Sequence, residues 1–193
     1  MKKADFPLVL RSIAAFTAGS TAVLILLYRH LGSGWMLTAA ISFGTTAYHF
    51  VMRLAVGYLL PKATDYRFDH RSKWFQPRRR EGELYRRLGV KHWKGRLPTY
   101  APEQFSLKTN TVYRVIQNMC GAELVHEIIV VLSFLPLAAV PIFGEFPVFL
   151  VTSCLAGLYD SLFVIAQRYN RPRLVRIYEK QLRTHGERIS QDG

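Results

Sequence analysis

Apolar residues gather in four long segments of the chain, and polar residues separate them. The segments run over about residues 7–28, 33–60, 120–142 and 146–167. A helix needs roughly 20 predominantly apolar residues to cross the hydrocarbon of a bilayer. None of the segments alternates apolar and polar residues with period two, as the strands of a membrane barrel do. The pattern therefore predicts an all-α integral membrane protein with four transmembrane helices, in a single membrane domain over residues 1–193.

The polar stretch between the second and third segments, residues 61–111, has structure of its own. The run "RREGELYRRLGV" is compatible with a short helix, with leucines on one side and arginines on the other. Trp74, Phe75 and Trp93 stand among basic residues, a mixture typical of the headgroup layer. We expect this loop to lie on the cytoplasmic leaflet.

The chain after the fourth segment reads as an interfacial helix over residues 172–186. Leu174, Tyr178 and Leu182 repeat at helical spacing and form an apolar stripe. Pro172 has no backbone N–H to offer the carbonyl four residues earlier, so we expect the fourth membrane helix to break at Asn170–Pro172. Gly186 suits the C-terminal cap of the new helix.

Charge strengthens the membrane interpretation. The net charge is +13 although half of the residues are hydrophobic. Thirteen Lys and Arg residues lie in 61–111 and seven follow Gln167, whereas the short connection at 141–146 has none. Because Lys and Arg favour the cytoplasmic side, both termini and the long loop should be cytoplasmic. Nucleic-acid binding is disfavoured, since the arginines flank apolar runs and do not line a polar domain.

The third apolar segment opens with three ionisable residues on one helical face: Glu123, His126 and Glu127. Ionisable groups in a membrane segment are costly and usually face the bundle interior. His is the commonest general base, and a neighbouring carboxylate can orient its ring. We assign the base to His126 and the orienting carboxylate to Glu123. The alternative for Glu123 is a solvated position at the cytoplasmic interface.

Three further polar residues lie within apolar segments. His49 and Arg53 share one face of the second segment, and Asp160 lies about two turns before the end of the fourth. An isolated ionised Asp in hydrocarbon is unfavourable, so Asp160 should be protonated or paired, with Arg53 or His49 as natural partners. A substrate contact and a structural role are both open for His49 and Asp160, and His49 is the alternative general base.

Arginines crowd the end of the fourth segment in the run "QRYNRPRL", residues 167–174. A guanidinium binds a phosphate through two parallel donors, so the run could hold a phosphorylated donor. Ordinary attraction of the run to anionic lipid headgroups is the alternative. The residues expected to contact substrate here are Arg168, Asn170, Arg171, Arg173, Trp93 and Lys94. The two cysteines have no metal-ligand spacing, and no metal or cofactor is predicted.

Three stretches of the chain carry a resemblance to a known family: "VKHWKGRLP" (90–98), "AELVH" (122–126) and "QRYNRPRL" (167–174). In order and approximate spacing they resemble the glycosyl-4,4'-diaponeurosporenoate acyltransferases, small membrane enzymes of bacterial carotenoid synthesis. The similarity runs from about Trp74 to the C-terminus. It departs at Glu127, where we expect a bulky apolar residue. The resemblance implies transfer of a fatty acyl group onto a sugar hydroxyl of a glycosylated lipid.

Together these observations predict a multi-pass acyltransferase of the bacterial cell membrane. Its partners would be an acyl donor such as acyl-CoA, a lipid acceptor and anionic membrane lipids. Two alternatives remain open: a non-catalytic membrane scaffold that binds anionic lipid and a partner enzyme, and a small membrane methyltransferase.

Overall fold

The computed structural model describes residues 6–65 and 67–191, the last seven of these by backbone alone. Over these residues the chain is helical and contains no strand, which confirms the predicted all-α class. The elements are α1 (Phe6–Leu31), α2 (Gly34–Thr64), α3 (Glu81–Arg87), α4 (Val90–Trp93), η1 (Lys94–Arg96), η2 (Pro102–Phe105), α5 (Val112–Leu132), η3 (Leu135–Ala139), α6 (Val140–Phe143) and α7 (Phe146–Gln191).

Three stretches of the described helices are long and apolar enough to cross a membrane: Phe6–Leu31, Val112–Phe143 and Phe146–Thr184. They correspond to the first, third and fourth predicted segments. The second segment forms a helix, α2, but it is not among these three. His49 and Arg53 lie in its middle, and hydroxyl residues such as Thr45 lower its hydropathy further. A fourth span therefore stays a prediction.

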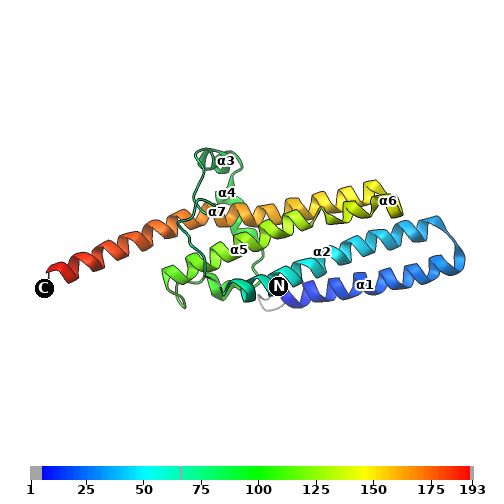
Figure 1. Ribbon diagram of the computed structural model, residues 1–193, viewed down its shortest axis with the longest axis horizontal. Coiled ribbons are helices and arrows are strands. Elements are labelled where there is room, and N and C mark those ends of the chain that lie inside the picture. The colour runs from blue at the N-terminus through cyan, green and yellow to red at the C-terminus, as the bar shows by residue number, and fades with distance from the viewer. Residues whose placement is uncertain (1–5, 66, 192–193) are drawn as a thin grey trace. The chain divides into compact units, whose positions relative to one another are not determined.

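The chain divides into two compact units, and the first comprises residues up to 60 together with 125–161. Within it, α1 and α2 run antiparallel (Figure 1) and join at Gly32, whose φ of 64° suits glycine. The Thr38 hydroxyl donates to Glu145 Oε1 at 2.6 Å, and the Tyr48 hydroxyl donates to the Leu132 carbonyl at 2.9 Å. These bonds connect α2 to the end of α5 and to the residue that precedes α7.

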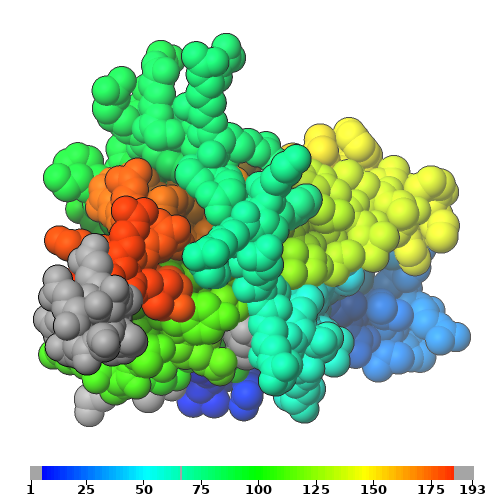
Figure 2. Space-filling view, turned by 60° about the vertical axis from the view of Figure 1, so that its left-hand side comes forward, coloured from blue at the N-terminus to red at the C-terminus, as the bar shows by residue number. Residues whose placement is uncertain are grey.

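The second unit comprises residues 61–124 and those from 162 onward. Its core is formed by Phe75, Ile116 and Cys120. Five partly buried residues pack against this core: Phe68, Val112, Leu174, Val175 and Tyr178. The expected helix in the basic loop is present as α3, and Figure 2 shows the green loop segment lying against the orange part of α7. The loop is thus folded and packs on other parts of this unit, and its position on a membrane leaflet stays a prediction.

Helix α5 begins at Val112, eight residues before the predicted start of the third segment. The hydroxyl of Thr111 accepts a hydrogen bond from the backbone N–H of Arg114 at 3.2 Å. This is the geometry of an N-terminal cap, which satisfies one of the first helical donors. The polar residues Gln117 and Asn118, which interrupt the apolar pattern, are both buried in this unit.

The predicted break at Asn170–Pro172 is wrong, because α7 continues through Pro172 to Gln191. A proline inside a helix costs about 3 kcal/mol, since a hydrogen bond is lost and the ring crowds the preceding turn. Contacts on both sides offset this cost. Upstream, Arg168 and Arg171 form buried ion pairs, and downstream Leu174 and Tyr178 pack on the Phe75 core.

The expected stripe of the separate tail helix is accordingly part of α7. Leu174 and Tyr178 lie on the core of the second unit, whereas Ile177 and Leu182 are about half exposed. The helix also continues past Gly186, so this glycine does not end it. Whether the exposed side chains contact a membrane surface stays a prediction.

Candidate functional site

A buried cluster of charge lies in the first unit, where α2, α5 and α7 supply Arg53, His126 and Asp160. Arg53 donates to Asp160 Oδ2 from Nε at 2.8 Å, and its Nη2 forms a second bond to the same oxygen. His126 Nδ1 lies 2.9 Å from the other oxygen, Oδ1. The Asp160 side chain is only 1% exposed. The predicted pairing of Asp160 with Arg53 is therefore present.

This arrangement determines the chemistry available to His126. A carboxylate paired with a guanidinium is ionised, so Oδ1 accepts and Nδ1 of the imidazole donates. In the neutral ring the basic lone pair then resides on Nε2. The His126 side chain is 23% exposed, so it is not sealed inside the protein. A His–Asp pair of this kind can act as a general base.

His49 lies next to this cluster on α2. Its carbonyl accepts a hydrogen bond from Arg53 Nη1 at 3.1 Å, and its ring contacts Tyr48 with centroids 5.4 Å apart. The residue is 4% exposed, and among the described residues neither ring nitrogen has a hydrogen-bond partner. A buried polar group without a partner costs free energy. His49 is thus a buried imidazole with unused hydrogen-bonding capacity.

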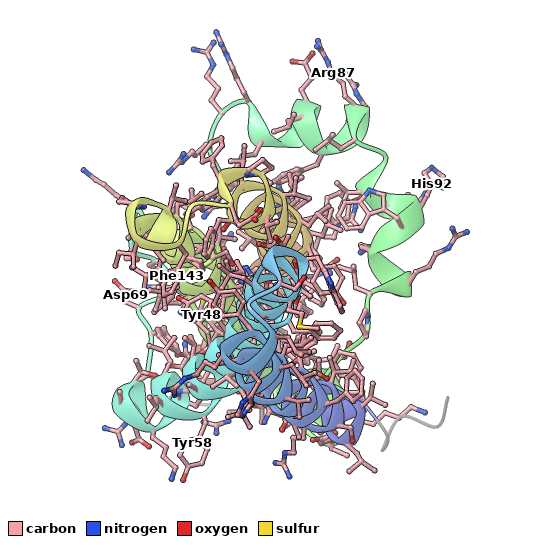
Figure 3. The ribbon with its side chains drawn as sticks, turned by 90° about the vertical axis from the view of Figure 1, so that its right-hand side faces the viewer. Tyr48, Tyr58, Asp69, Arg87, His92 and Phe143 are labelled. Atoms are coloured by element: carbon pink, nitrogen blue, oxygen red, sulfur yellow. The ribbon has the colours of Figure 1, made fainter. Side chains whose placement is uncertain are left out.

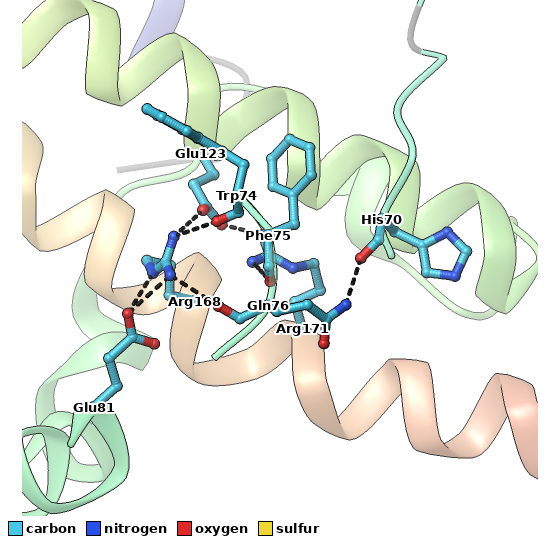
Figure 4. A network of polar contacts seen from close by, with 8 residues as sticks. All are labelled: His70, Trp74, Phe75, Gln76, Glu81, Glu123, Arg168 and Arg171. Carbon is cyan, nitrogen blue, oxygen red and sulfur yellow. Dashed lines mark hydrogen bonds and ion pairs between the residues drawn. The ribbon is translucent and has the colours of Figure 1, made fainter. Parts of the chain in front are cut away.

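The second unit contains a separate ion-pair network, shown in Figure 4. Glu123 on α5 is fully buried, and each of its oxygens accepts from a different arginine of α7. Arg168 Nη1 donates to Oε1 at 2.8 Å, and Arg171 Nη1 donates to Oε2. Arg168 also donates to Glu81 Oε1, from Nε at 3.0 Å and Nη2 at 2.8 Å. Two carboxylates therefore neutralise two arginines.

The remaining donors of these arginines hold the basic loop in place. Arg168 donates to the backbone carbonyls of Trp74 and Gln76 at 3.1 and 3.2 Å. Arg171 donates to the carbonyl of Phe75, and its guanidinium lies 5.0 Å from the centre of that ring. Both arginines are at least nine-tenths buried. Their observed partners are protein groups, which fits a role in fixing residues 74–76 against α7.

A third cluster of polar residues surrounds the ring of Tyr169. The Lys94 ammonium and the Arg173 guanidinium each lie 4.7 Å from the ring centre. Lys94 also donates to Asn170 Oδ1, and Arg173 Nη2 donates to the Tyr169 hydroxyl at 2.9 Å. Trp93, at the preceding position of the loop, donates from its indole nitrogen to the Leu88 carbonyl at 3.0 Å. The substrate roles predicted for these residues stay predictions.

Comparison with known families shows which family the chain belongs to. The family model of glycosyl-4,4'-diaponeurosporenoate acyltransferase matches residues 71–180, more than half of the chain. The chain belongs to this family. No curated protein and no solved structure matched it. Membership confirms the resemblance noted in the sequence and supports an acyltransferase role in carotenoid-related lipid modification.

The matched region of this acyltransferase includes His126 and Asp160 of the first cluster and all of the Glu123 network. His49 and Arg53 lie outside it. The sequence assigned the carboxylate that orients His126 to Glu123, whereas the structure places Asp160 at hydrogen-bond distance from the ring. Glu123 instead accepts from Arg168 and Arg171, and the part played by Glu81 was not predicted. Nothing in the sequence alone indicates that Asp160 is the partner of His126. Among the described residues no group of His, Cys, Asp and Glu could hold a metal ion.

Proposed function

We propose that this protein is a membrane-bound O-acyltransferase that moves a fatty acyl group onto a hydroxyl of a glycosylated lipid, such as a glycosyl carotenoid. Family membership supports the reaction class. The observation that carries the proposed centre is the 2.9 Å hydrogen bond between His126 Nδ1 and an Asp160 carboxylate that Arg53 holds in place. The chain would lie in the bacterial cell membrane with four spans and both termini in the cytoplasm.

In the proposed reaction, His126 Nε2 takes the proton of the acceptor hydroxyl as the hydroxyl oxygen attacks the acyl carbonyl. A new ester C–O bond forms, and the bond between the acyl carbon and the leaving group of the donor breaks. The leaving group then receives the proton from the imidazolium. Asp160 holds the ring in the correct tautomer and stabilises its charged form. A general base of this kind contributes about 10²- to 10⁴-fold to a rate.

His49 is suited to position the acceptor. A sugar hydroxyl can both donate and accept, and so it can satisfy an imidazole nitrogen that the protein leaves unpartnered. Binding energy is gained in this way, because the buried imidazole forms a hydrogen bond that it lacks in the free protein. We therefore assign His49 to substrate binding and the general base to His126.

The experiment that tests the proposal is acyl transfer by the purified protein in lipid nanodiscs. A glycosyl carotenoid and a fatty acyl donor are supplied, and the product is detected by mass spectrometry as the ester. His126→Gln should lower the rate by about 10²- to 10⁴-fold. His92→Gln is the matched control, since His92 projects away from α4 (Figure 3) and is exposed. Equal rates for the two variants would refute His126 as the base.

A further inference from the structure

We propose that Lys94 and Arg173, brought together at the ring of Tyr169, form a phosphate-binding site. This proposal rests on the proposed function in one respect: it takes the phosphate to be part of the acyl donor. It separates this pair from Arg168 and Arg171, with which the sequence groups them.

The first argument is charge balance within the arginine run. Arg168 and Arg171 are buried and share the carboxylates of Glu81 and Glu123. Lys94 and Arg173, in contrast, pair with no carboxylate among the described residues. The positive charge of this part of the second unit is therefore left uncompensated at Lys94 and Arg173.

The second argument is that the fold holds two like charges against one aromatic ring. Both lie 4.7 Å from the centre of one ring, although one comes from the loop and the other from α7. Burial, and after it the positive charge of Arg173, hold the pKa of Lys94 below its ordinary value. Two cations held against one ring repel each other, and an anion that contacts both would reduce that cost.

The third argument is the supply of donors. The Tyr169 hydroxyl accepts from Arg173, so its own O–H can still donate. The Asn170 side-chain oxygen accepts from Lys94, which leaves the amide N–H groups for a ligand. Lys94 provides a point charge and Arg173 a planar pair of donors, and both kinds of group bind phosphate.

Neighbouring contacts fix this site before any ligand arrives. Tyr85 packs on Tyr169 with ring centroids 6.2 Å apart. On either side of Tyr169 and Asn170, the buried Arg168 and Arg171 hold α7 to residues 74–76. A rigid site loses less entropy when it binds its ligand, so it binds more tightly.

The shared chemistry is a phosphate group, and two sources can provide it. One is a soluble phosphorylated donor of the acyl-CoA class, and the other is an anionic lipid headgroup. The test uses the purified full chain in nanodiscs of neutral phosphatidylcholine, with coenzyme A as the soluble probe in titration calorimetry. A second arm replaces the probe with phosphatidylglycerol and measures its enrichment around the protein.

The variants are Lys94→Met and Arg173→Met, each with a control that removes the same charge from the same segment: Lys91→Met and Arg176→Met. All four residues carry one positive charge, and Lys91 and Arg176 are exposed. Loss of a charge-assisted bond should weaken binding roughly 10- to 150-fold at Lys94 or Arg173. Each control should stay within about twofold of the wild type, because it removes only general attraction.

Selective weakening of coenzyme A binding supports the site with the donor as its ligand. Selective loss of phosphatidylglycerol enrichment alone supports the site with a lipid headgroup as its ligand. Equal effects in site and control variants, or no binding in either arm, overturn the proposal. The result is independent of catalysis: a His126→Gln protein should bind coenzyme A normally even though it transfers acyl groups far more slowly.

Discussion

The buried carboxylate of Glu123 provides the sharpest stability prediction. Glu123→Gln keeps the size of the side chain but removes its charge, while Arg168 and Arg171 keep theirs. Arg168 retains the Glu81 carboxylate as a partner, whereas Arg171, which is 2% exposed, would have neutral partners such as the Phe75 carbonyl and no carboxylate. Removing one partner of a buried ion pair costs about 3–5 kcal/mol, which lowers the folding equilibrium constant about 10²- to 10⁴-fold.

The assay is thermal unfolding of the detergent-purified protein, followed by tryptophan fluorescence. The control is Glu83→Gln, which removes the exposed Glu83–Arg87 pair of α3 and should change stability by less than about 1 kcal/mol. The double variant Glu123→Gln with Arg171→Met should be more stable than Glu123→Gln alone, because no unpaired charge then remains at Arg171. An unfolding midpoint for Glu123→Gln equal to that of Glu83→Gln would refute the reasoning.

Three further predictions concern pH, packing and topology. The pKa of buried His70 is lowered, first by burial and then by Arg71, against the opposing charges of Asp69 and Glu179. Since the folded state disfavours the protonated ring, stability should fall as pH drops below the unfolded pKa of about 6.5. His70→Gln should flatten this dependence in unfolding measurements, whereas the exposed-site variant His92→Gln should leave the slope as in the wild type. Gly157→Ala would place a methyl group 3.1 Å from the Phe134 ring, and crowding of this kind costs about 1–3 kcal/mol. Gly19→Ala, with open space around it, should not lower the unfolding midpoint; equal losses in the two variants would contradict the packing. For topology, single cysteines placed at Gly32 and Gly144 should react with an impermeant reagent on intact cells. Cysteines placed at Arg79 and Arg183 should not react. Labelling of the Arg79→Cys variant would contradict a cytoplasmic loop.

The sequence predicted those features that follow from local composition. The long apolar segments became helices, and the turns at Gly32 and Gly144 lie between predicted segments. The pairing of Arg53 with Asp160 also followed from a local rule, since an ionised carboxylate within an apolar segment requires a partner. The family resemblance needed only three short stretches of sequence.

Features that depend on packing between distant residues could not be predicted in the same way. Pro172 obeys a local rule for breaking helices, but Leu174 and Tyr178 gain enough by packing on the Phe75 core to continue α7. Glu81 lies in an arginine-rich stretch that predicts a solvent-exposed side chain, yet its carboxylate accepts a hydrogen bond from Arg168. Spacing alone placed Glu123 and His126 on one face, and it gave no information about which residues of α7 lie beside each.

The central claim is that His126 and Asp160 act as one unit in acyl transfer. The most direct test is a double-mutant cycle on the transfer rate in nanodiscs, with His126→Gln, Asp160→Asn and the double variant compared at equal amounts of folded protein. Asp160 acts only through the ring of His126, so the double variant should be no slower than His126→Gln, within about twofold. If instead the two losses multiply, or if His126→Gln transfers acyl groups at the wild-type rate, the His126–Asp160 pair is not the catalytic centre.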